Sequence, residues 1–437
     1  MSQIDPLKLC RSIFICFFCA GFCLIIDIAK CVIALTPCYR CYFIRSANGD
    51  IDARHNRGSM KVTAMIVCGY NLRMTEMDIT PLPAKPFGAV VKNFDCAEIS
   101  DSVASLFREH LYQYQLLVFQ DQHHLNPDQE VAFYKALNPD NGSIWRDQEA
   151  NPWERFKIEQ GNVAGTFQIP CQPGVLVIGK GDIDHYGLEV TLGGDRTAYG
   201  GDAGSQVLGG GALQWHIDGT FYDQEPCHFT QMRCVEPPTG SGHWLDYADG
   251  SDARLWAEAG STAFASGRVA YELTDAKIQA RMDQMKVHYM SNPFQASYGL
   301  GNSADGLKVL DPDQELLYAN NAEQPGSLIN DPLAKVYTLI WPCNYTGKKA
   351  LMPHTRCMDH LVDGDSSSHL GKSQSRNLTA QWMRPAIEPD LVYVHNWQAG
   401  DLVIWNNRSM WHSATGKLAQ NDRRIQHLTA FNGTKAP

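Results

Sequence analysis

Short apolar runs separated by Gly, Pro and polar residues recur along most of the chain. Residues 86–94 (PFGAVVKNF), 115–122 (QLLVFQDQ) and 174–179 (GVLVIG) have this pattern, which is typical of β-strands. Near the C-terminus, residues 401–408 (DLVIWNNR) and 423–431 (RRIQHLTAF) repeat it. The pattern therefore predicts a protein built mainly from strands.

Helical signals are fewer and stand mostly before the middle of the chain. Residues 100–114 carry apolar side chains at helical spacing, with Ser100 in the N-cap position. Residues 126–137 begin with Asn as the cap and Pro at the first helical position, a favoured helix start. A third helix is predicted over residues 275–287.

Between these elements, residues 138–211 are rich in Gly, Asp and Asn. Irregular stretches of this length inside a domain commonly form lids or binding loops. No internal repeat is visible, and the 36 Gly and 22 Pro favour turns over long helices. We expect one domain over residues 74–437, mainly β with flanking helices, preceded by a separate segment, residues 1–73.

The segment before residue 74 differs from the rest in composition. Residues 7–44 are strongly hydrophobic and hold seven of the 14 cysteines. The apolar run at residues 13–26 is shorter than the ~20 residues that a membrane-spanning helix needs. With basic residues on both sides, it predicts either an anchor that contacts a membrane or an artefact of the gene model, with translation starting at Met74 or Met77.

Charge separates the two parts and excludes one class of partner. The formal net charge is -10, although residues 1–73 hold nine Lys and Arg against four Asp. The body is therefore acidic and has no cluster of Lys and Arg, which argues against a nucleic-acid partner. Its scattered cysteines are typical of reduced thiols. We expect a cytoplasmic protein, either free or anchored through its N-terminus.

The stretch LQWHIDGTFY places His216 and Asp218 two residues apart, on one face of a strand. Far downstream follows His412, and then Arg423 and Arg424. Two imidazoles and one carboxylate on one face of an octahedral metal leave three positions open, as non-haem Fe(II) oxygenases require. A guanidinium nearby would hold a co-substrate carboxylate by a paired hydrogen bond.

With WHIDGTF, GDLVIWNNR, His412 and RRI in this order, residues 79–431 resemble the Fe(II)/2-oxoglutarate-dependent dioxygenases of the taurine dioxygenase type, the TauD/TfdA superfamily. The resemblance implies a double-stranded β-helix, or jelly roll. It also implies Fe(II), 2-oxoglutarate and O₂ as cofactor and co-substrates, with Arg424 matching the 2-oxoglutarate arginine better than Arg423. The iron ligands that it implies are His216, Asp218 and His412.

Three positions depart from the family pattern. The family usually has Asp in its W-D-N-R motif, where this chain has Asn406, so a supporting hydrogen bond should differ. The second 2-oxoglutarate contact is commonly a Thr, whereas the stretch PPTGSGHW offers Trp244 or His243. Taurine-binding members carry a second Arg four residues after the first, and Leu428 here argues against taurine.

Within the superfamily, VLVIGKGD, HYGLEVTL and LIWPCNYTGKKAL resemble the fungal xanthine dioxygenase branch, which hydroxylates a purine. That branch has polar side chains where this chain has Leu428 and Ala430, on the same strand face as Arg424. Unpaired purine amides would cost ~1–3 kcal/mol each. We expect a small, less polar organic substrate, with a purine such as xanthine as the alternative. The candidate substrate contacts are Lys180, His185, Tyr186, Gln214, Tyr222 and Leu428.

Two other functions are compatible with the same residues. One is a non-catalytic, membrane-associated binding protein on a degenerate dioxygenase fold. The other is a zinc hydrolase that uses the same two histidines and aspartate. Retention of all three ligands together with the arginine favours the oxygenase, and the sequence leaves the oligomeric state open.

Overall fold

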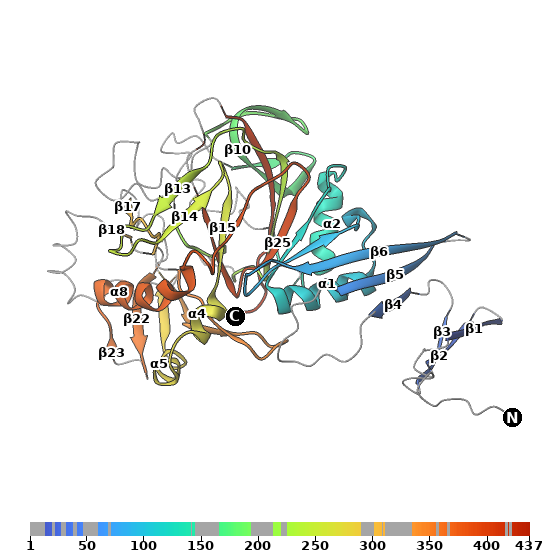
Figure 1. Ribbon diagram of the computed structural model, residues 1–437, viewed down its shortest axis with the longest axis horizontal. Coiled ribbons are helices and arrows are strands. Elements are labelled where there is room, and N and C mark those ends of the chain that lie inside the picture. Colours follow the sequence, from blue (N-terminus) through green and yellow to red (C-terminus); the bar gives the residue numbers. More distant parts are fainter. Residues whose placement is uncertain are drawn as a thin grey trace. The chain divides into compact units, whose positions relative to one another are not determined.

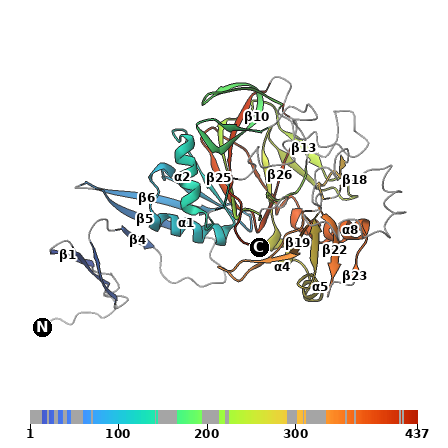
Figure 2. The same cartoon turned by 180° about the vertical axis from the view of Figure 1, so that it is seen from behind.

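The chain divides into two units, Met1–Ile79 and Thr80–Pro437, in the computed structural model shown in Figures 1 and 2. The boundary predicted at residue 74 falls inside a strand, β6 (Asn71–Pro81). Before residue 77 the structure describes only strands. From there it describes residues 77–140, 142–144, 166–193, 213–219, 225–289, 301–307, 309–310, 334–354, 358–364, 368–415, 418 and 422–437.

The first unit contains two sets of antiparallel strands. Its strands are β1 (Phe14–Cys19), β2 (Phe22–Asp27), β3 (Val32–Pro37), β4 (Tyr42–Ser46), β5 (Met60–Cys68) and β6. β2 pairs with β1 and β3, and β5 pairs with β4 and β6. Among the residues described, no helix is both long and apolar enough to cross a membrane.

The largest sheet of the second unit has the strand order β11-β10-β27-β12-β25-β8-β7. Neighbouring strands are antiparallel except β7 and β8, which are parallel and are connected through helix α1. We call it the main sheet. Its strands are β7 (Ala89–Lys92), β8 (Leu116–Phe119), β10 (Gln172–His185), β11 (Leu188–Gly193), β12 (Phe229–Glu236), β25 (Leu402–Asn406) and β27 (Arg424–Thr429), with β9 (Thr166–Ile169) paired to β10.

A smaller sheet packs against the main sheet. It has the order β24-β15-β26, from β15 (Thr262–Ser266), β24 (Tyr393–His395) and β26 (Met410–Ala414). One core cluster joins Met232, Trp405 and Leu428 of the main sheet to Phe264 and Met410 of the smaller one. Burying such a side chain contributes ~1.5–3 kcal/mol, so this layer stabilises the sheet pair. The prediction of a mainly β fold with flanking helices is confirmed.

Both helices predicted near the start of the domain are present. α1 (Asp101–Tyr114) begins after Ser100, whose side chain accepts from Val103 N–H. α2 (Pro127–Leu137) has a complete capping box, because Asn126 and Gln129 each bond the other's backbone N–H. α1 contacts β8 and β25, and α2 contacts β10 and β27, so both helices lie against the main sheet (Figure 2).

The prediction of a third helix over residues 275–287 is wrong in its second half. α5 (Ala276–Met282) begins after its cap, but the chain then enters β16 (Lys286–Tyr289). Val287 and Tyr289 are buried and alternate with more exposed neighbours, which is the period of a strand. The strand pattern prevails because β16 pairs on both sides, with β19 (Lys335–Thr338) and β22 (Met358–Asp363).

The sequence did not predict the helix α8 (Lys372–Met383), which packs on β22. Its buried positions include Ser375 and Thr379 as well as Trp382 and Met383, so the apolar stripe that marks an amphipathic helix is interrupted. The remaining elements are η2 (Cys96–Glu98), β13 (His243–Asp246), β14 (Arg254–Ala257), α4 (Gly267–Glu272), β17 (Gly301–Asn302), β18 (Val309–Leu310), β20 (Ile340–Pro342), β21 (Lys349–Leu351), β23 (Ser368–His369) and η5 (Arg384–Ile387).

Asn126→Ala is expected to lower the free energy of unfolding by ~0.5–2 kcal/mol, because Gln129 N–H at the start of α2 loses its side-chain acceptor. Urea unfolding followed by circular dichroism measures the change. Asn126→Ser is the control, since serine keeps an acceptor oxygen at the cap. Equal stability of the alanine variant and the wild type would contradict a role for this capping box.

Candidate metal centre

Three side chains from distant parts of the sequence meet at one point of the fold. His216, Asp218 and His412 each offer a ligand atom, and these atoms lie within 4.8 Å of one another. Asp218 and His412 are buried. Within the part of the chain that the structure describes, no other group of three His, Cys, Asp or Glu side chains is arranged in this way.

The backbone brings the two histidines together. His216 N–H donates to His412 O at 3.1 Å, and His412 N–H donates to His216 O at 3.0 Å. This antiparallel bridge puts both side chains on one face, and their ring centroids are 4.1 Å apart. Asp218, two residues after His216, comes to the same side in extended backbone.

The orientation of the His216 ring follows from a single hydrogen bond. Nδ1 lies 2.8 Å from the carbonyl oxygen of Gln214. Because a carbonyl can only accept, Nδ1 carries the hydrogen and Nε2 carries the ligand lone pair. An imidazole that ligates a metal is commonly oriented in this way.

Asp218 is held from two sides. Thr230 of β12 donates its hydroxyl to Asp218 Oδ2 at 3.2 Å. Asn407, directly after β25 and fully buried, accepts from Asp218 N–H at 2.9 Å and donates to Asp218 O at 2.7 Å. Asn407 thus acts on this short segment as a neighbouring strand would, and it fixes the peptide that carries the carboxylate.

His412 points at the carboxylate from the smaller sheet. Its Nε2 lies 3.6 Å from Asp218 Oδ2, which is too long for a good hydrogen bond. Two ligand atoms that bind the same ion at ~2.1 Å each are ~3 Å apart when they occupy neighbouring coordination positions. Trp405 and Phe264 flank the ring, with centroids at 4.9 and 6.4 Å. The donor set therefore fits a divalent metal in a site that is largely shielded from water.

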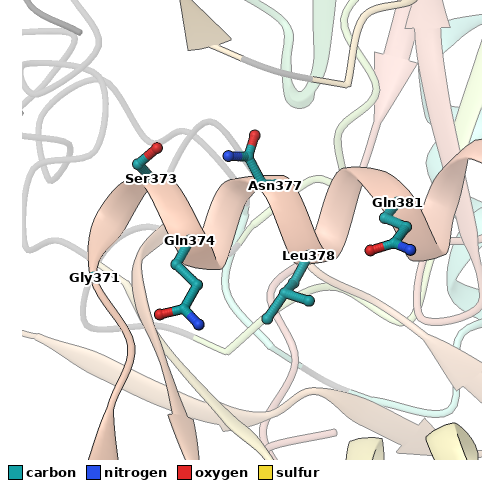
Figure 3. A pocket seen from close by; sticks show the side chains of 6 residues that line it. All are labelled: Gly371, Ser373, Gln374, Asn377, Leu378 and Gln381. Atoms are coloured by element: carbon teal, nitrogen blue, oxygen red, sulfur yellow. The ribbon is translucent and has the colours of Figure 1, made fainter. Parts of the chain in front are cut away.

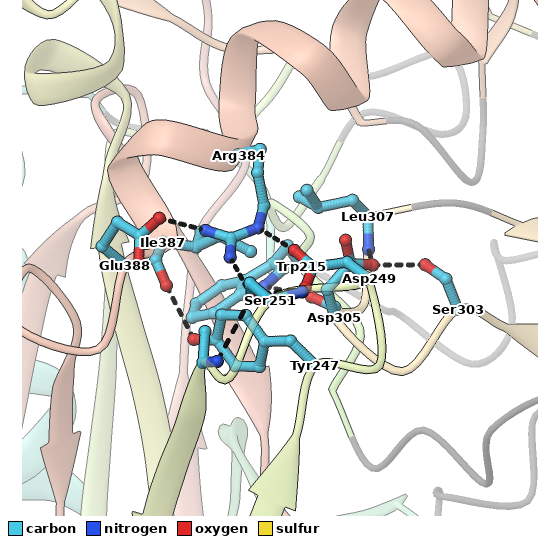
Figure 4. Close-up of polar contacts among 11 residues, drawn as sticks. Trp215, Tyr247, Asp249, Ser251, Ser303, Asp305, Leu307, Arg384, Ile387 and Glu388 are labelled. Carbon is cyan, nitrogen blue, oxygen red and sulfur yellow. Dashed lines mark hydrogen bonds and ion pairs between the residues drawn. The ribbon is translucent and has the colours of Figure 1, made fainter.

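A turn on the other side supports the segment that carries the ligands. Trp215, next to His216, donates its indole N–H to Asp305 O at 3.0 Å and its backbone N–H to Gly306 O at 3.2 Å. Figure 4 shows this turn, with Ser303 and Leu307 bonded to the Asp305 carboxylate. The sequence motif did not predict this support, because it depends on residues about 90 positions away.

The two adjacent arginines differ in their surroundings. Arg423 is exposed and its Nε lies 3.1 Å from a carboxylate oxygen of Glu236, also at the surface. Arg424 is half-buried and lies on the β27 face that carries Leu428 in the core. Its guanidinium donates to Gln426 Oε1. Of the two, Arg424 faces the interior of the sheet pair.

Trp244 lies in the antiparallel strand pair β13–β14, directly opposite Trp256. Trp244 is 49% exposed, and the guanidinium carbon of Arg254 lies 4.3 Å from the centroid of its ring. His243, the other residue considered, has Nε2 2.8 Å from the carbonyl oxygen of Thr415. The structure therefore engages both residues with other groups, and it does not bring Trp244 to the metal ligands.

The residues considered as substrate contacts separate into two sets. Gln214 adjoins the ligand segment, and Lys180 and Leu428 lie on the interior face of β10 and β27. His185 ends β10 on the opposite face of the main sheet from Leu428, and Tyr186 follows it in a turn; the rings of both lie beside that of His427. The structure does not bring this pair to the metal ligands, and Tyr222 lies outside the described residues.

His185 instead belongs to a buried polar network under α2. Its Nε2 is 2.7 Å from His427 Nε2, and His427 Nδ1 is 2.8 Å from Glu130 Oε1. Arg233 donates to the same carboxylate oxygen at 2.8 Å. Burial, with His427 and Arg233 nearby, lowers the pKa of His185 to about 4. His185 is therefore neutral at pH 7, and the network connects α2 to the sheet.

At Asn406, where the family pattern has Asp, the side chain stabilises a turn. Asn406 Oδ1 accepts from Arg408 N–H at 3.1 Å, and the Arg408 guanidinium donates to Pro226 O at 2.8 Å. The hydrogen bonds to the peptide of Asp218 come from the next residue, Asn407. The sequence did not single out this residue, nor His354, whose buried ring lies 6.0 Å from that of His216.

A groove of about 610 Å³ runs along α8. Figure 3 shows that its side chains come from one face of this helix. It is lined by Gly371, Ser373, Gln374, Asn377, Leu378 and Gln381. None of these carries a charge or a good metal ligand, so this groove does not compete with the metal centre as the candidate active site.

Comparison with known proteins agrees with this geometry. The family model described as "Taurine catabolism dioxygenase TauD, TfdA family" matches residues 78–430. An alpha-ketoglutarate-dependent xanthine dioxygenase of Schizosaccharomyces pombe is 29% identical over 368 residues, covering 80% of this chain and 86% of the relative. The corresponding enzyme of Emericella nidulans is 28% identical over 349 residues, covering 78% and 90%.

More distant relatives act on other compounds. The (S)-phenoxypropionate/alpha-ketoglutarate-dioxygenase of Sphingobium herbicidovorans is 24% identical, covering 77% of this chain and 89% of the relative. Among solved structures, a taurine dioxygenase from Burkholderia xenovorans matches with a TM-score of 0.50 at 17% identity, covering 82% of this chain and 89% of that chain. At this identity the structural likeness concerns the fold alone.

Asn407→Ala is expected to weaken divalent metal binding by ~10–100-fold, because the peptide of Asp218 loses its side-chain partners. Titration of the metal-free protein with Co(II), followed by its visible absorption, measures the affinity. Asn377→Ala, an exposed asparagine of α8, is the matched control. If Asn407→Ala loses stability but binds Co(II) as the wild type does, Asn407 has no role in positioning the ligand.

Proposed function

The chain belongs to the TauD, TfdA family of dioxygenases, and on that premise we propose that His216, Asp218 and His412 hold its catalytic iron. Membership makes the chain a 2-oxoglutarate-dependent non-haem iron dioxygenase. The observation that carries the assignment of the ligands is their convergence within 4.8 Å. Two imidazoles and a carboxylate are the donor set that non-haem Fe(II) oxygenases use.

Each residue around the site has a separate task in the proposed reaction. A bound ferrous ion would let O₂ convert 2-oxoglutarate to succinate and CO₂ while a C–H bond of a second substrate is hydroxylated. The Gln214 carbonyl keeps Nε2 of His216 available as a ligand, and Asn407 fixes Asp218. Arg424 would bind the distal carboxylate of 2-oxoglutarate through two parallel N–H donors.

We also propose that the sheet pair is a double-stranded β-helix. The main sheet and the smaller sheet pack face to face around one core cluster, and the metal ligands lie where the two sheets meet. His412 comes from the smaller sheet, whereas Thr230, which bonds Asp218, comes from the main sheet. The likeness to a solved taurine dioxygenase supports the same architecture.

The proposed substrate is a small organic molecule less polar than a purine. Leu428 and Ala430 are buried on the face that carries Arg424, so these two positions offer no polar group to pair with purine amides. The similarity to xanthine dioxygenases keeps xanthine as the second candidate. The five cysteines found as free thiols suit a reducing compartment, and we place the reaction in the cytoplasm.

His216→Ala and Asp218→Ala are each expected to reduce succinate formation by more than ~100-fold with the fold intact, since a lost ligand costs more than a lost supporting bond. Succinate released from 2-oxoglutarate with Fe(II) and O₂ is quantified by chromatography, and circular dichroism checks the fold. His124→Ala removes an exposed histidine that pairs with Asp95 and should leave turnover unchanged. Full turnover in either ligand variant means that the iron binds elsewhere.

Zn(II) in place of Fe(II) is expected to abolish succinate formation, because zinc has no redox chemistry. The same assay distinguishes the substrates: a true substrate raises the rate of succinate release and is itself hydroxylated. Xanthine, other purines and less polar aromatic acids form the panel. Hydrolysis of a test ester or amide by the zinc-loaded protein would instead indicate a hydrolase.

A further inference from the structure

The backbone bridge between His216 and His412 consists of a single rung. Both hydrogen bonds of this pair are present, but the bridge is isolated and is not part of a longer ladder. In an antiparallel pair, the residues two positions further along each strand form the next hydrogen-bonded rung. On one side of the bridge, a regular ladder would therefore continue by joining Gln214 to Ala414.

The hydroxyl of Ser413 takes the place of that rung. Gln214 N–H donates to Ser413 Oγ at 2.6 Å, and Ser413 Oγ donates to Ala414 O at 2.9 Å. A hydroxyl can accept and donate at the same time, so it relays the bond that Gln214 N–H would otherwise make to Ala414 O. Between these two described residues no direct backbone hydrogen bond forms. Ser413 is fully buried, which shields the relay from bulk water.

The other side of the bridge has a similar arrangement. The next rung there would involve Asp218, whose peptide bonds instead to the side chain of Asn407, through N–H at 2.9 Å and through O at 2.7 Å. A polar side chain thus interrupts the ladder on each side of the bridge. The two interruptions limit regular pairing to His216 and His412, the residue pair that carries two of the three ligands.

The interruption at Ser413 affects the carbonyl that orients the His216 ring. In a regular ladder, carbonyls point toward the neighbouring strand within the sheet, whereas side chains stand out of its plane. A Gln214 carbonyl held in a rung with Ala414 would therefore point away from the imidazole. In this structure it accepts from His216 Nδ1 at 2.8 Å. The inserted hydroxyl occupies the place of the rung and leaves the carbonyl to the imidazole.

We propose that Ser413 is a positioning residue of the metal centre, whose hydroxyl spaces the two ligand-bearing segments so that the Gln214 carbonyl holds His216 Nδ1–H and directs Nε2 to the metal. The inference rests on the proposed function, in which His216 is a ligand. Ser413 acts through the Gln214 peptide and is not itself a ligand. The sequence gave no sign of this role, because it depends on the register between distant segments.

Ser413→Ala removes the hydroxyl and allows Gln214 N–H to bond Ala414 O directly. Because a backbone bond replaces the relay, the urea midpoint of the metal-free protein is expected to stay at the wild-type value. The Gln214 carbonyl turns into the ladder and releases His216. Co(II) affinity, titrated by visible absorption, is therefore expected to fall by ~10–100-fold, the usual cost of losing an outer contact of a ligand.

A second measurement follows the imidazole hydrogen itself. In the Co(II)-loaded protein, the N–H protons of ligating imidazoles give strongly shifted proton resonances that disappear in D₂O. The proton between His216 Nδ1 and the Gln214 carbonyl is held by a hydrogen bond and should exchange slowly in the wild type. In Ser413→Ala it is expected to exchange ~10-fold faster, the worth of one hydrogen bond.

Three further variants make the result specific. Ser413→Thr keeps a hydroxyl and should retain Co(II) affinity and slow exchange. Ser413→Cys carries a weaker donor and acceptor and should show intermediate losses, which provides the comparison if the alanine variant does not fold. Ser409→Ala removes another buried serine, in the turn before the same strand, and should behave as the wild type.

Other results overturn the proposal in distinguishable ways. Wild-type Co(II) affinity and slow exchange in Ser413→Ala, with or without a loss of stability, refute the role of Ser413 and leave the proposed function intact. Lower affinity with slow exchange preserved also refutes it, because the hydrogen bond of His216 then does not depend on the hydroxyl. A wild type that binds Co(II) no better than His216→Ala refutes the proposed function and this inference together.

Discussion

The site depends on one antiparallel bridge, the pair of backbone hydrogen bonds between His216 and His412. These residues lie about 200 positions apart, and closing so long a loop has an entropic cost that local interactions cannot offset. The packing of the smaller sheet on the main sheet supplies the compensating free energy through the burial of Phe264, Trp405 and their neighbours. The metal centre is therefore a product of the core.

Around this bridge, hydrogen bonds between side chains and backbone groups do much of the positioning. The Gln214 carbonyl sets the tautomer of His216, and the Asn407 amide holds the peptide of Asp218. On the other side, Trp215 bonds the turn at Asp305. Each of these contacts fixes a short segment that makes few bonds within itself, which is how a fold preorganises ligand geometry before a metal binds.

The interior face of β27 changes from charged to apolar along its length. It begins with Arg424, continues with Gln426, and ends with Leu428 and Ala430 in or beside the core. Opposite its charged end stands Lys180.

Sequence alone determined the strand-rich character of the domain, the two capped helices and the residue types of the metal centre, because periodicity, caps and donor chemistry act over a few neighbouring residues. It failed where tertiary pairing prevailed over local pattern, as at Lys286–Tyr289, and where a buried helix face is partly polar, as in α8. Only the tertiary structure decided that Arg424 faces the interior while Arg423 does not, and that Lys180 stands opposite it. Strand register sets these relations, and register joins residues whose separation along the chain leaves no local trace.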